Sequence, residues 1–373
     1  MIIVAIILGI FLIIQLFSWI SIKIYQPRDI DPIRHYPKVS ILLAARNEEL
    51  LIGRCLDAMD QLTYPKDKLE IIIGDDDSTD NTLSIVRDFI KNKSNFQVHS
   101  IQNIIGKGRG KANVLGQLAH QATGEFLFIT DVDVKLPPTW IQALLQEFEE
   151  GIGLVSGTTM CESGNLFATM QSIDWLHFMG YIKAFAHVGV GCTSVGNNMA
   201  VRAEAYWQTG GYEVIDFSIT EDYKLFQAVT KLGWGWKNIL SKYSLGKAWF
   251  IPSFVDMLHQ RKRWLIGAKD LPLNWKTMII IYGLFIPAFG YVMLFYPIYA
   301  LGIWLLKFFM QSLFILLLCD KTGVRRFTLV ELISYEIYVM LNTFSTAIFY
   351  YLPIKSIWKD RIYGASYIED GVQ

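Results

Sequence analysis

The chain of 373 residues has no excess of charge, because 34 lysines and arginines balance 34 aspartates and glutamates. This balance and the 52% share of hydrophobic residues argue against a disordered chain and against a nucleic-acid-binding protein. Cysteine is scarce as well, and no two cysteines form a Cys-x-x-Cys pair. We therefore expect reduced cytosolic thiols, and neither a disulfide framework nor a metal cage, at Cys55, Cys161, Cys192 and Cys319.

The first 22 residues contain no charged side chain. At about 20 residues per crossing, this segment is long enough to span a bilayer. No basic stretch precedes it and no small-residue cleavage site follows it, so residues 1–22 are predicted to form an uncleaved anchor. A removed signal peptide is the alternative. Basic residues directly after the span favour the cytosol for the domain that follows: Lys23, Arg28, Arg34 and Lys38.

A second region that is poor in charge covers residues 278–319, where Lys307 is the only charged side chain. Its length suits two crossings with a turn near Tyr296, Pro297 or Gly302. The basic residues that follow predict a return to the cytosol: Lys321, Arg325 and Arg326.

A third apolar run, residues 327–353, contains Glu331 and Glu336, which are costly in lipid unless they face protein or water. Both ends carry basic residues, and the two ends of one crossing cannot both be cytosolic. Either the run is a hairpin or re-entrant segment, or the charge rule fails here. We expect two to four crossings within residues 277–354 and a cytosolic tail at 355–373, whose basic residues are Lys355, Lys359 and Arg361.

Between the apolar ends, short apolar runs alternate with stretches of helical periodicity. This alternation predicts an α/β domain with a mostly parallel sheet and helices on both faces. The predicted strands are residues 39–45, 69–74, 96–101 and 125–130, and the predicted helices include a stretch from residue 50 to 59 and residues 82–90 and 111–121.

Acidic side chains follow two of these strands, at Asp75, Asp76 and Asp77 and at Asp131 and Asp133. Ligands of parallel sheets collect at the carboxyl ends of the strands, and clustered like charges do not favour stability. For the first cluster an ordinary helix N-cap is the alternative, and for the second a surface turn. The two carboxylates of the second cluster flank one residue, so both can reach one Mg²⁺ or Mn²⁺ ion.

Other short motifs accompany these acids. In chain order they are Ala44-Ala45-Arg46-Asn47-Glu48-Glu49, Asp75-Asp76-Asp77-Ser78-Thr79-Asp80, Gly110-Lys111-Ala112, Asp131-Val132-Asp133, Gly196-Asn197-Asn198-Met199-Ala200-Val201-Arg202, Gly210-Gly211-Tyr212, Thr220-Glu221-Asp222 and Gln260-Arg261-Lys262-Arg263-Trp264. Over roughly residues 38 to 270 this order resembles the family 2 glycosyltransferases, which have a GT-A type fold. The family includes cellulose, hyaluronan and poly-N-acetylglucosamine synthases and ceramide glucosyltransferases. Two positions depart from it: Asp77 stands where glycine is usual, and Gly116 where asparagine is usual.

The resemblance implies a nucleotide-sugar donor whose nucleotide is UDP. It also implies that Asp76 lies near the base or the ribose of this donor. It implies these donor-binding residues: Ala44, Arg46, Glu48, Asp76, Lys111, Asp131, Gln260 and Arg263. A solvated basic face is the alternative for the stretch from Lys107 to Lys111.

The resemblance also implies a divalent metal, Mg²⁺ or Mn²⁺, on Asp131 and Asp133, where it would neutralise the leaving diphosphate. Asp222 would be the base of an inverting transfer, with Glu221 orienting it or binding the acceptor. Arg263 is a candidate clamp for phosphate, and Trp264 offers a flat face to the acceptor. A helix N-terminus and a basic amphipathic face are the alternatives for these two motifs.

The sequence thus predicts a transmembrane anchor at 1–22, a GT-A domain at 23–250 and an amphipathic interface segment at 251–276, ahead of the C-terminal spans. The predicted activity is transfer of a sugar to a polysaccharide or a lipid-linked acceptor at the cytosolic face of the cell membrane. Single-sugar transfer to a ceramide- or diacylglycerol-type lipid is one alternative. A transporter or a non-catalytic binding protein is another. Because the chain has few predicted membrane spans, a channel for a polymer would require a homo-oligomer or a partner subunit.

Overall fold

The computed structural model describes residues 2–32, 35–191, 193–359, 361–363 and 368–370, so Arg34 and Cys192 lie outside the described residues. The chain divides into two compact units. The helical unit comprises Met1–Pro27, Cys161–Cys192 and Phe250–Ser356, and the sheet unit comprises Arg28–Met160, Thr193–Trp249 and Ile357–Gln373. Residues near 161–192 therefore belong to the helical unit although they lie inside the predicted 23–250 domain, because helix α6 (Leu166–Ala186) packs with other helices of that unit.

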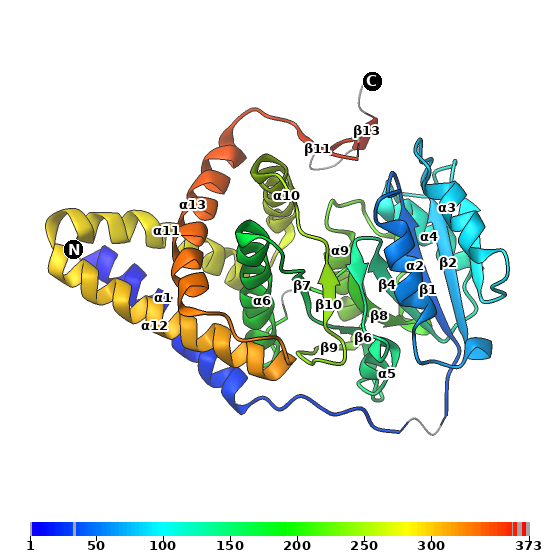
Figure 1. The fold of residues 1–373 in the computed structure, drawn as a ribbon, viewed down its shortest axis with the longest axis horizontal. Helices are drawn as coiled ribbons and strands as arrows, with labels where there is room; N and C mark the ends of the chain where they lie inside the picture. Colours follow the sequence, from blue (N-terminus) through cyan, green and yellow to red (C-terminus); the bar gives the residue numbers. More distant parts are fainter. Residues whose placement is uncertain (1, 33–34, 192, 360, 364–367, 371–373) are drawn as a thin grey trace. The chain divides into compact units, whose positions relative to one another are not determined.

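A seven-stranded sheet forms the centre of the sheet unit, in the order β3-β2-β1-β4-β8-β6-β9 (Figure 1). Strands β1 to β4 are parallel, β8 is antiparallel to both β4 and β6, and β9 is parallel to β6. The strands are β1 (Val39–Ala45), β2 (Leu69–Asp75), β3 (Phe96–Ser100), β4 (Phe126–Asp131), β6 (Ile152–Ser156), β8 (Asn198–Arg202) and β9 (Gly235–Asn238). The predicted α/β class with a mostly parallel sheet is confirmed.

Two small sheets and several helices complete the sheet unit. One small sheet has the order β5-β10-β7 and the other β11-β12-β13, with strands β5 (Val134–Lys135), β7 (Thr159–Cys161), β10 (Gly246–Ala248), β11 (Ser356–Trp358), β12 (Arg361–Tyr363) and β13 (Ile368–Asp370). The helices are α2 (Ile52–Asp60), η1 (Lys66–Lys68), α3 (Thr82–Ile90), α4 (Lys111–Gln121), α5 (Trp140–Leu145), α7 (Ala203–Gln208), α8 (Gly211–Val214) and α9 (Glu221–Lys231). The bounds of α3 and α4 agree with the sequence prediction.

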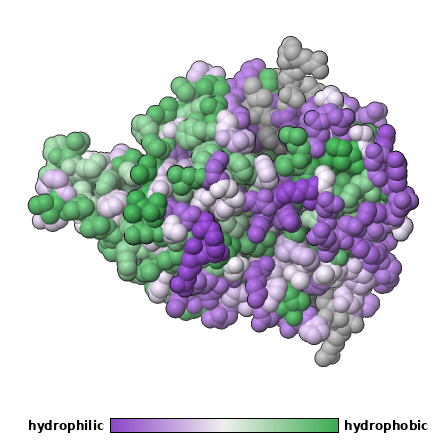
Figure 2. All heavy atoms as spheres, in the orientation of Figure 1, coloured by the Kyte–Doolittle hydropathy of each residue, from purple (hydrophilic) through white to green (hydrophobic). Residues whose placement is uncertain are grey.

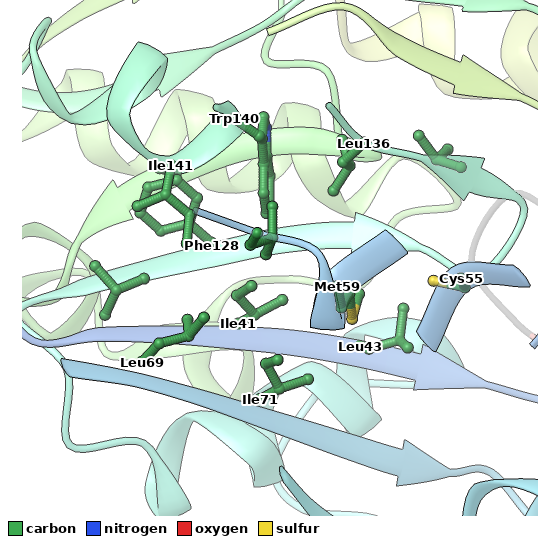
Figure 3. Packing of buried hydrophobic residues seen from close by; sticks show 14 of the residues in the cluster. Ile41, Leu43, Cys55, Met59, Leu69, Ile71, Phe128, Leu136, Trp140 and Ile141 are labelled. Atoms are coloured by element: carbon green, nitrogen blue, oxygen red, sulfur yellow. The ribbon is translucent and has the colours of Figure 1, made fainter. Parts of the chain in front are cut away.

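The core of the sheet unit explains why its strands are apolar on both faces. Ile41 and Leu43 of β1 belong to one cluster with Cys55 and Met59 of α2 (Figure 3). On the other side helix α4 approaches β2 so closely that a side chain at Gly74 would meet Val114. Side chains of a strand alternate between the faces, so helices on both faces require near-continuous apolar sequence.

The register of the parallel strands brings three strand ends to one edge. Ala45 at the end of β1 pairs with Asp75 at the end of β2, and Ala44 pairs with Asp131 at the end of β4. The loops that follow these strands therefore start side by side, which is where the predicted site residues lie.

The helical unit contains four helices that are long and apolar enough to cross a membrane: α1 (Ile2–Ile24), α11 (Leu273–Phe295), α12 (Pro297–Thr322) and α13 (Leu329–Tyr351). Hydrophobic residues cover α1, α11 and α12 in the space-filling view (Figure 2). Phe11 of α1 packs against Tyr282 and Phe285 of α11 with tilted rings, at centroid distances of 5.0 and 4.2 Å. The unit also holds α6, α10 (Phe254–Gly267) and η2 (Ala268–Asp270).

The charged residues of the apolar runs are satisfied inside the helical unit. Lys307 of α12 forms a buried ion pair with Glu336 of α13, at 2.6 Å. Glu331 forms the capping box of α13 with Thr328, at the start of the helix. Helix α13 runs without a break, so the hairpin interpretation of residues 327–353 is wrong.

Candidate active site

The loops after β1 and β2 are bound together by hydrogen bonds from the motif residues. The backbone N–H of Asn47 donates to Ser78 Oγ at 3.1 Å, and the N–H of Thr79 donates to Asn47 Oδ1 at 2.9 Å. The N–H of Glu48 donates to Thr82 Oγ1 at 2.7 Å. Two motifs separated by about one strand and one helix thus form a single rigid edge.

The departure at Asp77 has a conformational explanation. Asp77 has a φ of +57°, in the left-handed region that favours glycine. Aspartate enters this region more readily than most residues because its short polar side chain can hydrogen-bond locally. Arg46 stabilises the turn, since its Nη1 donates to the carbonyl oxygens of Asp76 at 2.6 Å and Asp77 at 3.2 Å.

We expect Asp77→Gly to leave the melting temperature almost unchanged and Asp77→Val to lower it by several degrees. A β-branched residue in the left-handed region costs about 1–2 kcal/mol, whereas glycine has no such cost. Thermal unfolding of the purified protein in detergent measures both variants, with exposed Asp67→Val as the control. Equal melting temperatures for Asp77→Gly and Asp77→Val would contradict a strained turn.

Lys111 joins three elements of the sheet unit. It begins α4, directly after Gly110, and its Nζ contacts Asp131 Oδ1 at 2.6 Å and Glu221 Oε1 at 2.9 Å. Burial alone would lower the pKa of Lys111, but the carboxylates of Asp131 and Glu221 raise it. The side chain is only 20% exposed, so a solvated basic face does not describe Lys111.

Asp133 lies among other acidic side chains just after the end of β4. Burial and, after it, the neighbouring carboxylates of Asp131 and Glu48 together raise the pKa of Asp133 to about 7. Burial also raises the pKa of Asp131. In the described part of the chain no group of three or more His, Cys, Asp or Glu side chains is placed to hold a metal. Two carboxylates nevertheless fit Mg²⁺ or Mn²⁺, which complete their shells with phosphate and water oxygens.

Asp222 is fixed by two backbone donors at the start of α9. The N–H of Gly196 donates to its Oδ2 at 2.9 Å and the N–H of Tyr223 to its Oδ1 at 2.8 Å. A side chain at Gly196 would come within 2.7 Å of Asp222 Cβ, so only glycine permits this approach. Burial, helped by Glu221, raises the pKa of Asp222 to about 7. The carboxylate is therefore oriented and close to the pKa that suits a base at neutral pH.

With Asp222 as the base that the family resemblance implies, we expect sugar transfer to increase as the pH rises through about 7 and to level off above it. The protonated form of Asp222 cannot accept a proton, and its raised pKa keeps that form populated below pH 7. The measurement is kcat/KM from about pH 5 to about pH 9 at saturating Mn²⁺. A flat profile across this range would contradict the assignment of Asp222.

The site also contains two basic residues, Lys359 and Arg361, whose sequence position indicates only membrane topology. Lys359 Nζ contacts Glu48 Oε1 at 3.0 Å, and Arg361 forms an ion pair with Asp76. Tyr212 is a third addition: it is buried, and its hydroxyl has no hydrogen-bond partner among the described residues. The Gly-Gly-Tyr motif pointed to Tyr212, whereas no motif pointed to the tail.

The sheet unit thus brings together most of the predicted site residues. They are Arg46, Glu48, Asp76, Lys111, Asp131, Asp133, Glu221 and Asp222, with Ala44 in β1 next to Asp131 in register. Gln260, Arg263 and Trp264 lie on α10 in the helical unit, where Trp264 packs against Trp175 at a centroid distance of 5.3 Å. Their roles stay predictions.

Comparisons with known proteins agree with this arrangement. Residues 40–210 match the family described as Glycosyl transferase family 2, and residues 126–352 match Glycosyl transferase family group 2. The "Probable glycosyltransferase YdaM" of Bacillus subtilis is 27% identical over 348 residues, which cover 80% of this chain and 79% of that protein.

Two other relatives have named products. The beta-monoglucosyldiacylglycerol synthase of Synechocystis sp. is 24% identical over 66% of this chain, and the poly-beta-1,6-N-acetyl-D-glucosamine synthase of Staphylococcus epidermidis is 27% identical over 64%. The chain covers only 53% and 57% of these two proteins.

Among solved structures, the mannosyltransferase PcManGT from Pyrobaculum calidifontis, in complex with GDP-Man and Mn²⁺, has a TM-score of 0.55 at 18% identity. The match covers 93% of this chain and 97% of the mannosyltransferase chain. At this identity it shows the fold alone, and it confirms the predicted GT-A class. Since the second family match spans more than half of the sequence, this chain belongs to the family 2 glycosyltransferases.

Proposed function

We propose that this protein is a metal-dependent, inverting transferase that moves a sugar from a UDP-linked donor to an acceptor at the membrane. One observation carries the proposal. Lys111 bridges Asp131 of the acidic pair and Glu221, the neighbour of Asp222, so the proposed donor side and the proposed base belong to one charge cluster. The match to the family 2 glycosyltransferases supports a nucleotide-sugar donor, and UDP follows from the resemblance of the motifs to that family.

A metal ion on Asp131 and Asp133 would supply Lewis-acid chemistry to the departing diphosphate. The chain's own residues do the rest. Lys111 keeps its positive charge beside Asp131, which lowers the repulsion between the acids and an anionic donor. The rigid edge formed by the loops after β1 and β2 presents Asp76 to the nucleoside.

Asp222 acts as the base in this proposal. Both oxygens accept backbone N–H groups, which fixes the carboxylate plane and leaves further lone pairs for the acceptor hydroxyl. Glu221, held by Lys111, adds negative charge that raises the basicity of Asp222. Direct attack by the activated hydroxyl inverts the anomeric carbon, so an α-linked donor would give a β-linked product.

The acceptor is either a growing polysaccharide or a membrane lipid. Both kinds of product occur in the names of the relatives, a diacylglycerol glycolipid and a poly-N-acetylglucosamine. We favour a transferase that forms a β-glycosidic bond to a polysaccharide or a lipid-linked acceptor. Product length by mass spectrometry, with labelled donor and purified protein, separates repeated from single transfer.

We further propose that α1, α11 and α12 cross the cell membrane and that α13 lies along its cytosolic surface. The residues before α11, up to Trp249, and the residues after α13, from Ile357, belong to the same sheet unit. An even number of membrane crossings must therefore separate Trp249 from Ile357. Of the three helices α13 is the least apolar, and in Figure 1 it runs across the direction of α11 and α12. Lys321 Nζ, at the end of α12, donates to Gln26 Oε1, just after α1, at 3.3 Å. This contact supports the placement of these two helix ends on the same side of the membrane.

Labelling of single cysteines in intact cells tests this topology. Tyr296→Cys, between α11 and α12, should react with an impermeant maleimide from outside. Arg326→Cys and Lys355→Cys, on the two sides of α13, should react only after the membrane is opened. Labelling of Lys355→Cys from outside would mean that α13 crosses.

The stereochemistry of the product tests the reaction type. We expect NMR of the product formed from an α-linked donor to show a β-anomeric proton from the first turnover. An α-linked product would overturn the inverting mechanism, and with it the role of Asp222.

A further inference from the structure

The segment that follows α13 returns to the sheet unit and places two cations on acids of the proposed donor site. Both guanidinium nitrogens Nη1 and Nη2 of Arg361 face the two carboxylate oxygens of Asp76, the second at 3.3 Å. Lys359 Nζ contacts Glu48 Oε1 at 3.0 Å and donates to the carbonyl oxygen of Asn47 at 2.6 Å. The tail therefore reaches the loop after β1 and the loop after β2 at the same time.

These contacts are largely shielded from solvent, which sets them apart from ordinary surface pairs. The side chains of Arg361 and Asp76 are only 13% and 14% exposed, and that of Glu48 is 12% exposed. Burial raises the pKa of Asp76 and of Glu48, against the attraction of the two cations. Without Arg361, the carboxylate of Asp76 would be a buried charge with a weaker hold on its orientation.

We infer that Arg361 is a positioning residue for the donor: its fork fixes the carboxylate of Asp76 toward the nucleoside, so that Lys359 and Arg361 are part of the donor site. This inference rests on the proposed function, since it requires that Asp76 binds the nucleoside. An ionised carboxylate has about four acceptor positions, so a bidentate arginine leaves positions for a ribose hydroxyl or a base N–H. Lysine cannot hold both oxygens in one plane.

The contacts of Lys359 and Arg361 also explain the spacing of these two basic residues, which membrane topology alone does not explain. A basic tail after a membrane helix needs only charge near the headgroups, which lysines in any position provide. Here Lys359 and Arg361 are two residues apart and bind acids of two different loops. Arg46 joins them, because its Nε donates to the carbonyl oxygen of Lys359 at 3.4 Å while its Nη1 holds the Asp76 turn.

Binding of UDP and of GDP to the purified full-length protein with Mn²⁺, followed by calorimetry, tests the inference. Arg361→Ala should weaken the binding of the preferred nucleotide about tenfold, the effect of one lost charge-assisted hydrogen bond. Arg361→Lys should fall between this variant and the wild type. In an Asp76→Asn background, Arg361→Ala should have no further effect, since Arg361 acts through Asp76.

The control is Arg326→Ala, which removes another arginine that faces both oxygens of an aspartate, Asp320, at 2.9 and 2.8 Å. It should leave nucleotide affinity unchanged. For the transfer reaction we expect Arg361→Ala to raise the donor KM and to leave kcat within about twofold, as lost ground-state binding does. A melting temperature close to that of the wild type shows that the fold persists; if Arg361→Ala does not fold, Arg361→Lys carries the test.

Three results would overturn the inference. Unchanged affinity in Arg361→Ala and Arg361→Lys would remove Arg361 from the donor site. An equal loss in the wild-type and Asp76→Asn backgrounds would mean direct contact with the nucleotide. Tighter binding would mean that the tail blocks the site. If the wild-type protein binds neither nucleotide, the proposed function itself fails, a result that no tail variant produces.

Discussion

Asp222→Asn should reduce sugar transfer by a factor of about 10² to 10⁴, the usual contribution of a general base, while nucleotide binding persists. An amide is nearly isosteric with the carboxylate, but it cannot accept the proton of the acceptor hydroxyl. The substitution has a structural cost as well. Both carboxylate oxygens of Asp222 accept a backbone N–H, and an amide offers only one oxygen, so one donor loses its partner at a cost of about 1 kcal/mol.

Three measurements separate these effects: the transfer rate, the affinity for UDP with Mn²⁺, and the melting temperature. Asp216→Asn is the matched control, because Asp216 lies in the same unit with its side chain 81% exposed and paired to Lys107. This control should retain full activity. Near-normal turnover by Asp222→Asn would remove Asp222 from the role of base.

Asp133→Ala should weaken the binding of the nucleotide donor at least about 10- to 100-fold in the presence of Mn²⁺, since even supporting groups of metal ligands have effects of this size. Without metal, the same substitution should leave affinity unchanged or raise it. The reason is that Asp133 is a half-buried acid among other acids, and an anionic donor gains when that charge is removed.

Calorimetry with UDP, once with Mn²⁺ and once with a chelator, measures this difference. Exposed Asp67→Ala serves as the control and should behave like the wild type in both conditions. Equal affinity of Asp133→Ala and the wild type for the metal complex of UDP would count against the metal assignment.

The parallel half of the fold could be predicted because its signals are local. Strands β1 and β2 are short apolar runs that end at polar loops, and Gly74 and Val114 meet where α4 covers the sheet. The antiparallel half has no such signal. Strand β9 reads Gly-Trp-Lys-Asn, a sequence with neither alternation nor an apolar run, and it becomes a strand only because β6 lies beside it.

The candidate site divides in the same way. Asp131, Asp133 and Asp222 could be named as candidates because they stand at strand and helix ends within recognisable motifs. The pairing of Lys111 with Glu221 joins residues that are far apart in sequence, and only the folded chain reveals it. From the sequence alone, Arg361 indicates only membrane topology, since nothing near it in sequence predicts a contact with Asp76.

We propose that one charge cluster, linked through Lys111, turns over a nucleotide sugar. The most direct test is the release of nucleoside diphosphate by the purified full-length protein, with a panel of nucleotide sugars, Mn²⁺ and a membrane-lipid extract as acceptor. We predict release from one donor or a narrow group of donors, lost on chelation of the metal and in Asp222→Asn. Absence of release from every donor, or release that Asp222→Asn does not change, would contradict the account.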